Sequence, residues 1–342
     1  MRINLILHNP KIQAIWRILT HPLSVLFFAN LLVYGFFIPL LGFYWDDLDF
    51  YWLHLHAGNK GLVQYFATDG PIMGILYQIN FTLLGDTPWK WQAFSFFWRY
   101  VCASGIYFLI RQLIRNRTEP ALMVSVIFLF FPGFSQQYIA MCYGHFYIAL
   151  SSLIFSLGLS LYVVNQQKHR LLLTLLAIFL ASVNLFTTEY FFTLELLRPI
   201  LIWAVIGGKN NRLSETFKQW WPFIIVFITA VLWRAVYFGN QTATYDFVTI
   251  DLIKSQPWLG IKTLILQITR DLWWTIIATW KKVFIFPSII TFGRSVTLST
   301  PYTEGYAFGE GRELLGTRTA QPPTLAPNGT VHPGFVRLFS KC

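Results

Sequence analysis

The sequence predicts an all-α fold, a polytopic transmembrane bundle of about eight or nine helices with interfacial helices in its first outside loop. Two observations predict this class. Hydrophobic residues make up 55% of the 342 residues, and apolar runs recur over most of the chain. Charged residues make up only 12%, which is too little to cover a water-facing surface. This composition excludes soluble enzyme folds, disordered scaffolds and disulfide-stapled secreted domains.

The first apolar run extends from residue 22 to residue 43 without a charge. At 1.5 Å per residue it is long enough to cross roughly 30 Å of hydrocarbon. It is interpreted as a span and not as a signal peptide, because no small-residue cleavage site follows it. The basic leader before it, with Arg2, Lys11 and Arg17, is also longer than the usual leader of a signal peptide.

Further spans are expected near residues 93–110, 120–138, 145–165, 171–187, 190–206 and 220–238, each bounded by charge or by Pro and Gly. The region 259–298 has two interpretations. Apolar residues from Trp258 to Leu272 recur at helical spacing among Lys262, Gln267, Arg270 and Asp271. This pattern fits one polar span, or an interfacial amphipathic helix followed by a short span.

Assigning alternate connections to opposite sides of the membrane separates the charges. The N-terminal side holds basic residues: Arg2, Lys11, Arg17, Arg111, Arg115, Arg117, Lys168, Arg170, Lys209, Arg212, Lys218, Lys281 and Lys282. The opposite side holds mainly acids: Asp46, Asp47, Asp49, Asp69, Asp86, Glu189, Asp246 and Asp251. The positive-inside rule then predicts a cytoplasmic N-terminus, an outside loop at 44–92 and a multi-pass protein of the cell membrane.

The net charge of +11 therefore reflects topology and gives no reason to expect nucleic acid as a partner. Cys102, Cys142 and Cys342 match no metal-binding or redox spacing. Residues 1–298 are predicted to form the transmembrane module. Residues 299–342 are rich in Gly, Pro, Thr and Arg and are expected to form a disordered tail or a linker.

The outside loop is too long for a simple connector, and it gathers acids. It opens with Asp46 and Asp47 among aromatic residues, and two interfacial helices are expected in it, the first broken by Gly58 and Gly61. Two carboxylates beside apolar surface repel each other and lose hydration, which raises a pKa. Such a group suits a general base toward a hydroxyl or a ligand for a divalent cation. The alternative is that both are ordinary solvated loop acids.

Charges within predicted spans are costly and therefore informative. Arg99 lies in the second span, Glu195 and Arg198 lie three apart in the sixth, and Arg234 lies in the seventh. Glu195 and Arg198 have the spacing of a pair that neutralises itself. Glu189 and Arg234 have no partner nearby in the sequence, and arginines at an outer cavity would suit a phosphate.

The three histidines near these acids are expected to be structural. His54 and His56 lie two apart, so on one helix they would face different directions and make a poor metal pair. His145 follows Gly144 at the start of a span and is expected at the interface.

These motifs carry a resemblance. An acidic pair that opens a large outside loop after the first span resembles the polytopic membrane glycosyltransferases of the C superfamily (GT-C), such as protein mannosyltransferases and aminoarabinose transferases. The segments 44–47, 69–74 and 188–199 are similar to those of uncharacterised bacterial membrane proteins with that layout. Members of that group tend to carry Arg where this chain has Gly70.

The resemblance implies transfer of a sugar from a polyprenyl-phosphate carrier to an acceptor at the outer face, in a bacterial inner membrane. Asp46 or Asp47 would be the base that takes the acceptor proton, and the other would orient the acceptor or a metal. Asp69 would support the loop site. Some relatives need a divalent metal such as Mg²⁺ or Mn²⁺ and others do not, so the metal stays open, as do donor sugar and acceptor.

By residue chemistry, and not by the resemblance, Glu189 with Arg198 or Arg234 would line the cavity near the carrier phosphate. Two other interpretations stay open. The charges within spans fit a transporter or flippase of lipid-linked saccharides. The polar tail and Gly70 fit a non-catalytic truncated membrane protein.

Overall fold

The computed structural model of the chain describes residues 10–67, 70–114, 117–134, 136–166, 169–207, 211–238 and 248–284. These residues are mainly helical, and none of them lies in a strand. Contacts divide the chain into two units, residues 1–282 and residues 283–342. Only two residues of the second unit are described. The tail predicted at 299–342 lies outside the described residues.

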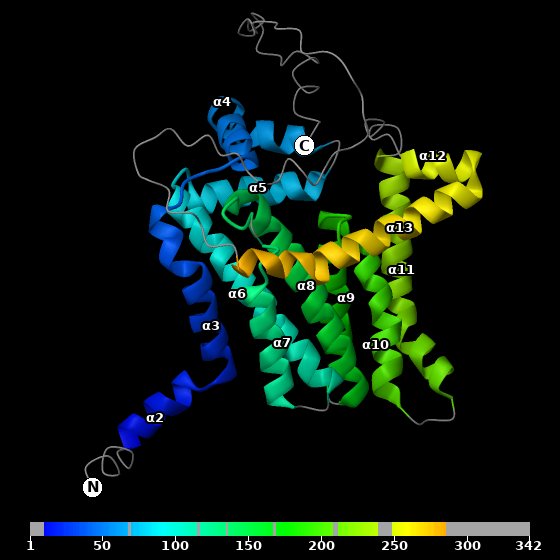
Figure 1. The fold of residues 1–342 in the computed structure, drawn as a ribbon, viewed down its shortest axis with the longest axis horizontal. Coiled ribbons are helices and arrows are strands. Elements are labelled where there is room, and N and C mark those ends of the chain that lie inside the picture. Colours follow the sequence, from blue (N-terminus) through cyan, green and yellow to red (C-terminus); the bar gives the residue numbers. More distant parts are fainter. Residues whose placement is uncertain are drawn as a thin grey trace, which may run out of the picture. The chain divides into compact units, whose positions relative to one another are not determined.

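The described part of the chain consists of α-helices and short 3-10 helices (Figure 1). They are α2 (Pro10–Leu19), α3 (Pro22–Val33), η1 (Gly35–Leu40), α4 (Asp46–Phe66), α5 (Pro71–Leu84), α6 (Pro88–Leu113), α7 (Thr118–Phe130), α8 (Ala140–Asn165), α9 (Arg170–Thr187), η2 (Phe192–Leu196), α10 (Leu197–Ile206), α11 (Arg212–Phe238), α12 (Val248–Ser255), α13 (Pro257–Ile276) and η3 (Ala278–Phe284). Proline occupies an initial position of α3, α5, α6 and α13, where a missing N–H costs no helical hydrogen bond.

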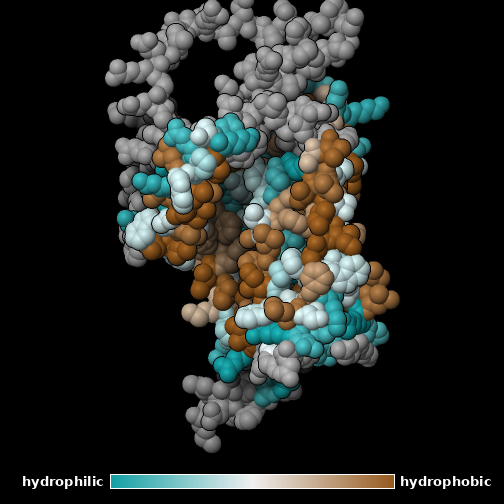
Figure 2. All heavy atoms as spheres, turned by 90° about the vertical axis from the view of Figure 1, so that its right-hand side faces the viewer, coloured by the Kyte–Doolittle hydropathy of each residue, from teal (hydrophilic) through white to brown (hydrophobic). Residues whose placement is uncertain are grey.

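Within the described residues, 5 helices are long and apolar enough to cross a membrane: Pro22–Leu40, Pro88–Leu113, Ala140–Asn165, Arg170–Thr187 and Arg212–Val236. Large apolar side chains stay exposed on them, such as Leu172 and Phe179 of α9. Figure 2 shows apolar residues across the middle of one face, with hydrophilic residues gathered at its two ends. This pattern suits a lipid bilayer around the bundle.

Two predicted spans differ from the observed helices. The span predicted at 120–138 is α7, which ends at Phe130, and residues 131–134 and 136–139 are not helical. The span predicted at 190–206 consists of η2 followed directly by α10, and α10 has 10 residues, about 15 Å or half of the hydrocarbon thickness. The total of eight or nine spans stays a prediction.

The centre of the bundle is the pair α6 and α8, with α9 on the other side of α8. Close packing of α6 and α8 depends on glycine. A Cβ at Gly144 would lie 2.7 Å from the ring of Phe94, and one at Gly158 would lie 2.6 Å from the ring of Phe108. Small residues bring helices together where lipid supplies no hydrophobic driving force.

The loop predicted at 44–92 folds mainly into α4 and α5, which contact each other and also reach α8 and α9 (Figure 1). Backbone dihedrals break α4 at Gly58, with φ 61° and ψ −165°, as predicted, whereas Gly61 stays helical. Along α5, Met73, Tyr77 and Phe81 are buried while Ile75 and Leu83 are exposed. One apolar face therefore packs on the bundle, and the other is free for lipid.

Candidate functional site

A strained turn leads into the acidic pair. Trp45 has φ 49° and ψ −124°, a left-handed backbone conformation that costs a residue with a Cβ of the order of 1 kcal/mol or more. The side chain of Trp45 is 68% exposed, so its own burial does not offset that cost. Such strain persists where surrounding structure enforces it, and here it fixes how Asp46 and Asp47 leave the turn.

Asp47 is a fully buried cap for another helix. Its Oδ2 accepts from Ala140 N at 2.8 Å, and its Oδ1 accepts from Met141 N at 3.0 Å and Cys142 N at 3.2 Å. These are the free N–H groups of the first turn of α8, where the helix dipole also favours an anion. Burial raises the pKa of Asp47 to about 7, and hydrogen bonds from Cys142 and the other backbone N–H groups oppose that rise.

Asp46 lies in a different environment although it is the next residue. It is half-buried, and no described residue donates a hydrogen bond to its carboxylate. Burial raises the pKa of Asp46, and the nearby charge of Asp49 raises it further. The structure thus separates two acids that the sequence left equivalent. Asp47 has both oxygens occupied, whereas the oxygens of Asp46 are available.

Residues in the first turn of α8 lie near Asp46. Its charge acts on Cys142 and Tyr143 in the first turn of α8, and Tyr143 in turn lies within electrostatic range of Tyr190. The ring of Tyr190 packs edge to face on Phe146 at 5.2 Å. The end of α8 that Asp47 caps therefore lies beside the segment that follows α9.

Glu189, which precedes Tyr190, forms an ion pair with Arg234 of α11. The distance from Arg234 Nη2 to Glu189 Oε1 is 2.7 Å, and the side chains are 21% and 46% exposed, respectively. Each residue thus supplies the partner that the sequence did not reveal for the other. The pair lies at the same end of the bundle as Asp46, because Glu189 follows α9 directly and Tyr190 contacts α8. The guanidinium is partly exposed at this end of the bundle.

Arg198 lies in a closed network instead. Its Nε and Nη2 bond to Glu195, its Nη1 donates to Ser156 O at 3.1 Å and to Ser160 Oγ, and its Nη2 also donates to Ser156 Oγ at 2.9 Å. The guanidinium stacks on the ring of Phe223, with 3.8 Å to its centroid. All five N–H donors are used, and Arg198 is 0% exposed. A phosphate would have to displace this network, which ties α10 to α8.

Arg99 is a third kind of buried charge. Its Nη2 donates to Leu129 O, and its guanidinium lies 5.2 Å from the centroid of the Phe134 ring. Leu129 is in the last turn of α7, where unpaired carbonyls attract a cation. Arg99 therefore joins the end of α7 to α6, and Asp47 joins the start of α8 to α4.

Two residues of the predicted loop site remain, Asp69 and Gly70. Asp69 lies outside the described residues, so its supporting role stays a prediction. Gly70 begins α5, and a Cβ there would meet Met73 Cβ at 3.4 Å and Thr187 O at 3.8 Å. These are ordinary contacts, so the backbone leaves room for a side chain. This position therefore lies close to the last residue of α9, beside the Glu189 segment.

The histidines make structural contacts. His145 is fully buried within α8, not at the interface, and its Nε2 lies 2.9 Å from Asn80 Nδ2 of α5. The ring of His54 stacks on Phe81, and its Nε2 lies 3.5 Å from Asp86 Oδ1. No three His, Cys, Asp or Glu side chains converge as a metal site among the described residues. Since Asp47 has its oxygens occupied, a divalent cation beside Asp46 would lack a second carboxylate from this pair.

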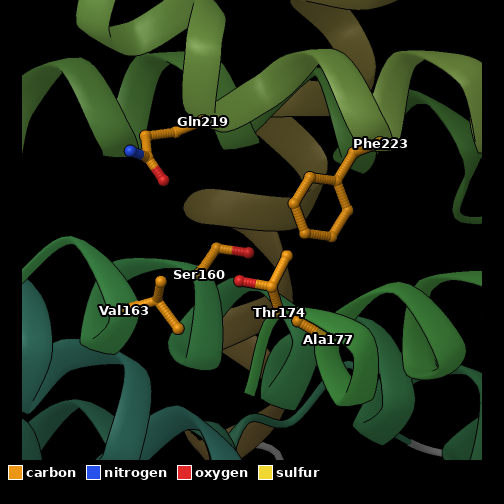
Figure 3. Close-up of a pocket in the computed structure, with 6 residues that line it drawn as sticks. All are labelled: Ser160, Val163, Thr174, Ala177, Gln219 and Phe223. Carbon is orange, nitrogen blue, oxygen red and sulfur yellow. The ribbon is translucent and has the colours of Figure 1, made fainter. Parts of the chain in front are cut away.

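Figure 3 shows a pocket between α8, α9 and α11. Its volume is ≈ 230 Å³ including its open mouth, and it is lined by Ser160, Val163, Thr174, Ala177, Gln219 and Phe223. The hydroxyls of Ser160 and Thr174 face each other in it. It is smaller than the usual site for a drug-sized ligand. Its hydroxyl Ser160 already accepts from Arg198, so the pocket borders the closed network and not the Asp46 end.

Sequence reasoning missed Gln92, which organises the Asp46 end from α6. Its Nε2 donates to Gly42 O and to Tyr138 O, each at 2.8 Å, and its Oε1 accepts from Tyr34. It thereby joins the approach to the strained turn with the approach to α8. The signal available in the sequence was a glutamine within an apolar segment, since a buried amide needs hydrogen-bond partners.

Comparison with known proteins gives no match to a family model, to a curated protein or to a solved structure. The fold and the charged residues therefore define the class of the protein, an α-helical protein with candidate membrane-spanning helices and a half-buried acid at one end of its bundle.

Proposed function

We propose that this protein is a GT-C-type membrane glycosyltransferase that moves a sugar from a polyprenyl-phosphate donor to an acceptor at the outer face. The observation that supports it best is the separation of the aspartates. Asp47 is held by α8, whereas Asp46 lies half-buried with a raised pKa, and none of the described residues donates a hydrogen bond to its oxygens. A positioned carboxylate of that kind suits general-base chemistry.

In the proposed reaction Asp46 accepts the proton of the acceptor hydroxyl. The hydroxyl oxygen attacks the anomeric carbon, a C–O bond forms, and the bond from that carbon to the carrier phosphate oxygen breaks. The electron pair leaves with the polyprenyl phosphate. Attack opposite the leaving phosphate needs one displacement, so the product has inverted configuration at the anomeric carbon.

Arg234 is the proposed contact for the leaving phosphate. It is partly exposed, and its partner Glu189 is the more exposed member of the pair. An incoming phosphate would share or replace that carboxylate at the guanidinium. Arg198 takes no part in this proposal, because all its N–H groups are already bonded. No step is assigned to a divalent metal, because the described donors beside Asp46 do not form a metal site.

The sidedness is part of the proposal. It places the Asp46 end of the bundle outside, in the periplasm of a bacterium, and the N-terminus in the cytoplasm, as the distribution of basic residues favours. The acidic residues of the α4 turn and the exposed apolar face of α5 suit a position in the headgroup layer.

The test is release of polyprenyl phosphate by the full chain in lipid nanodiscs. Radiolabelled polyprenyl-phosphate hexoses and pentoses are supplied with membrane extract as the source of acceptor. We expect release with at least one donor, and Asp46→Asn to lower it by about 10²–10⁴-fold at unchanged thermal stability. Release by Asp46→Asn at the wild-type rate would overturn the assignment of the base. Absence of release with every donor would overturn the proposed activity.

One observation favours the second candidate function, a transporter or flippase of lipid-linked saccharides. The segment expected as a span at 190–206 changes directly from η2 to α10, with Glu195 and Arg198 buried beside that change. Ionisable residues buried within a membrane bundle are frequent along transport pathways. Movement of a fluorescent polyprenyl-phosphate sugar across vesicles that contain the protein, without release of polyprenyl phosphate, would favour this alternative.

A further inference from the structure

Helix α13 has an apolar stripe that no other described helix covers. Ile261, Ile265, Ile268 and Leu272 follow one another at spacings of four, three and four, which places them on one side of a helix that turns 100° per residue. Ile265 is 57% exposed, Ile268 50% and Leu272 53%. Such a contiguous apolar face on a helix needs an occupant.

The side of α13 opposite the stripe holds polar residues together with the exposed Leu266 and Trp274. Thr263, Gln267 and Arg270 lie roughly half a turn away from the stripe. Arg270 is exposed, and its Nε lies 3.9 Å from Asp271 Oδ1, so neither charge is closely held. A helix that keeps its polar residues away from a continuous apolar stripe suits a position in a membrane surface.

The neighbouring helix α12 packs on α13 without covering the stripe. A Cβ at Gly260 would lie 2.6 Å from Ile253 Cα, so α12 approaches the first turn of α13 at backbone distance. Gly260 lies about 110° around the helix from the middle of the stripe. The two helices form a hairpin, and the apolar stripe lies on a side of α13 that α12 does not cover.

The residues at the two ends of α13 favour lipid, over protein or water, as the environment of the stripe. Trp258 near its start and Trp273 and Trp274 near its end are exposed, and tryptophan is enriched at the level of lipid headgroups. A spanning orientation would bring Lys262, Arg270 and Asp271 into hydrocarbon on a helix with few described neighbours. An in-plane orientation places Arg270 at the aqueous side, and Lys262 and Asp271 at the two flanks of the helix, level with the headgroups.

We infer that α13 lies in the plane of the membrane and inserts the stripe from Ile261 to Leu272 into the boundary between headgroups and acyl chains. It follows α11, whose last turns hold Arg234 against Glu189 at the Asp46 end of the bundle. The helix therefore attaches to the membrane surface at that end. This inference does not depend on the proposed function.

The test is spin labelling of the full chain in vesicles of phosphatidylcholine and phosphatidylglycerol, with Cys102, Cys142 and Cys342 replaced by alanine. Single labels are placed at Ile261, Ile265, Ile268 and Leu272, and at Thr263 and Gln267. Labels at Leu172, Leu175 and Phe179 of α9 are the matched controls, since they are exposed on a candidate span. Accessibility to oxygen and to a water-soluble nickel complex gives the depth of each label.

We expect the stripe labels to share one shallow depth in lipid, the labels at Thr263 and Gln267 to be accessible to nickel, and the α9 labels to change depth steadily. A steady change of depth along α13 would show a span. Low access to both reagents on the stripe would show a protein contact, and high nickel access would show water. Any of these three results overturns the inference.

A second measurement avoids the cysteine substitutions. Photoreactive benzoylphenylalanine is placed at Ile265 or at Gln267 in the otherwise unaltered chain. After illumination in the same vesicles, lipid adducts are expected at Ile265 and at most a tenth as many at Gln267. Equal adducts at both positions, or protein crosslinks at Ile265, would contradict the in-plane assignment.

Discussion

Two Glu–Arg pairs of the molecule have opposite environments. Glu195 and Arg198 are 2% and 0% exposed, and the arginine also bonds to Ser156 and Ser160. Glu189 and Arg234 are 46% and 21% exposed. The comparison teaches that residue type does not assign a role to a charge inside a membrane protein. The exposure of the charge and the contacts that the protein makes to it do.

The same distinction separates the two aspartates. Asp47 resembles Arg198, because its oxygens are occupied by the protein, and Asp46 resembles Arg234, because it remains partly accessible. Occupied charges hold helices together, and accessible ones are available to a substrate. The predictions below test that division.

The largest effect on stability is expected from breaking the buried pair. Arg198→Met leaves a buried glutamate without a partner, and Glu195→Leu leaves a buried guanidinium. Each is expected to lower the free energy of unfolding by about 3–5 kcal/mol. The double variant is expected to be more stable than either single variant, since it leaves no uncompensated charge. Denaturant titration in detergent micelles measures all three.

The matched control is the exposed pair Lys218–Glu215, whose side chains are 64% and 36% exposed. Lys218→Met is expected to cost less than about 1 kcal/mol. Arg198→Met with an equally small effect would show that the buried network does not hold α10 to α8.

An intermediate effect is expected from the pH dependence of Asp47. Its pKa is about 7 in the folded protein against 3.8 for the free side chain, so the folded chain binds more protons than the unfolded chain between these values. The free energy of unfolding should therefore fall as the pH rises from about 4 to about 7. In Asp47→Asn, the free energy of unfolding measured across that pH range should no longer show this fall. A slope that is the same in the variant would contradict it.

A smaller effect on stability, but a clear one on binding, is expected at Arg234. Arg234→Gln should change the free energy of unfolding by less than about 1 kcal/mol and raise the KM for the polyprenyl-phosphate donor by roughly tenfold or more. Arg234→Lys should recover part of the affinity. Donor titration in nanodiscs distinguishes the variants, and an unchanged KM in Arg234→Gln would remove this residue from the site.

The smallest effect is expected from Asp49. As a general base Asp46 acts when deprotonated, so the rate should rise with pH through its raised pKa. Asp49→Asn removes a negative charge that raises this pKa, and the rising limb should move to lower pH by less than about one unit. A shift to higher pH, or none, would show that Asp49 does not act on Asp46.

Composition and periodicity were sufficient to predict the helical class, the first span and the break at Gly58, because these depend on local properties. The end of α7 had a local signal, since Pro132 and Gly133 follow Phe131 directly and stop a helix, and the span predicted over 120–138 overlooked it. The environment of the segment 190–206 was not predictable, because Arg198 bonds to Ser156 and Ser160 of α8, about forty residues away in the sequence.

The candidate site was predictable only in part. Residue type identified Asp46, Asp47, Glu189 and Arg234 as charges near a predicted boundary, but not which acid would be occupied. The partner of Asp47 is the start of α8, more than ninety residues along the chain. No local pattern encodes that contact, nor the ion pair from Glu189 to Arg234.

The most direct test of the division between the aspartates is carbodiimide labelling of the folded chain in nanodiscs, followed by peptide mass spectrometry. The account predicts rapid adduct formation on Asp46, and adducts on Asp47 only after denaturation, because its oxygens are enclosed by the first turn of α8. Labelling of Asp47 in the folded protein at the rate of Asp46 or faster would contradict it.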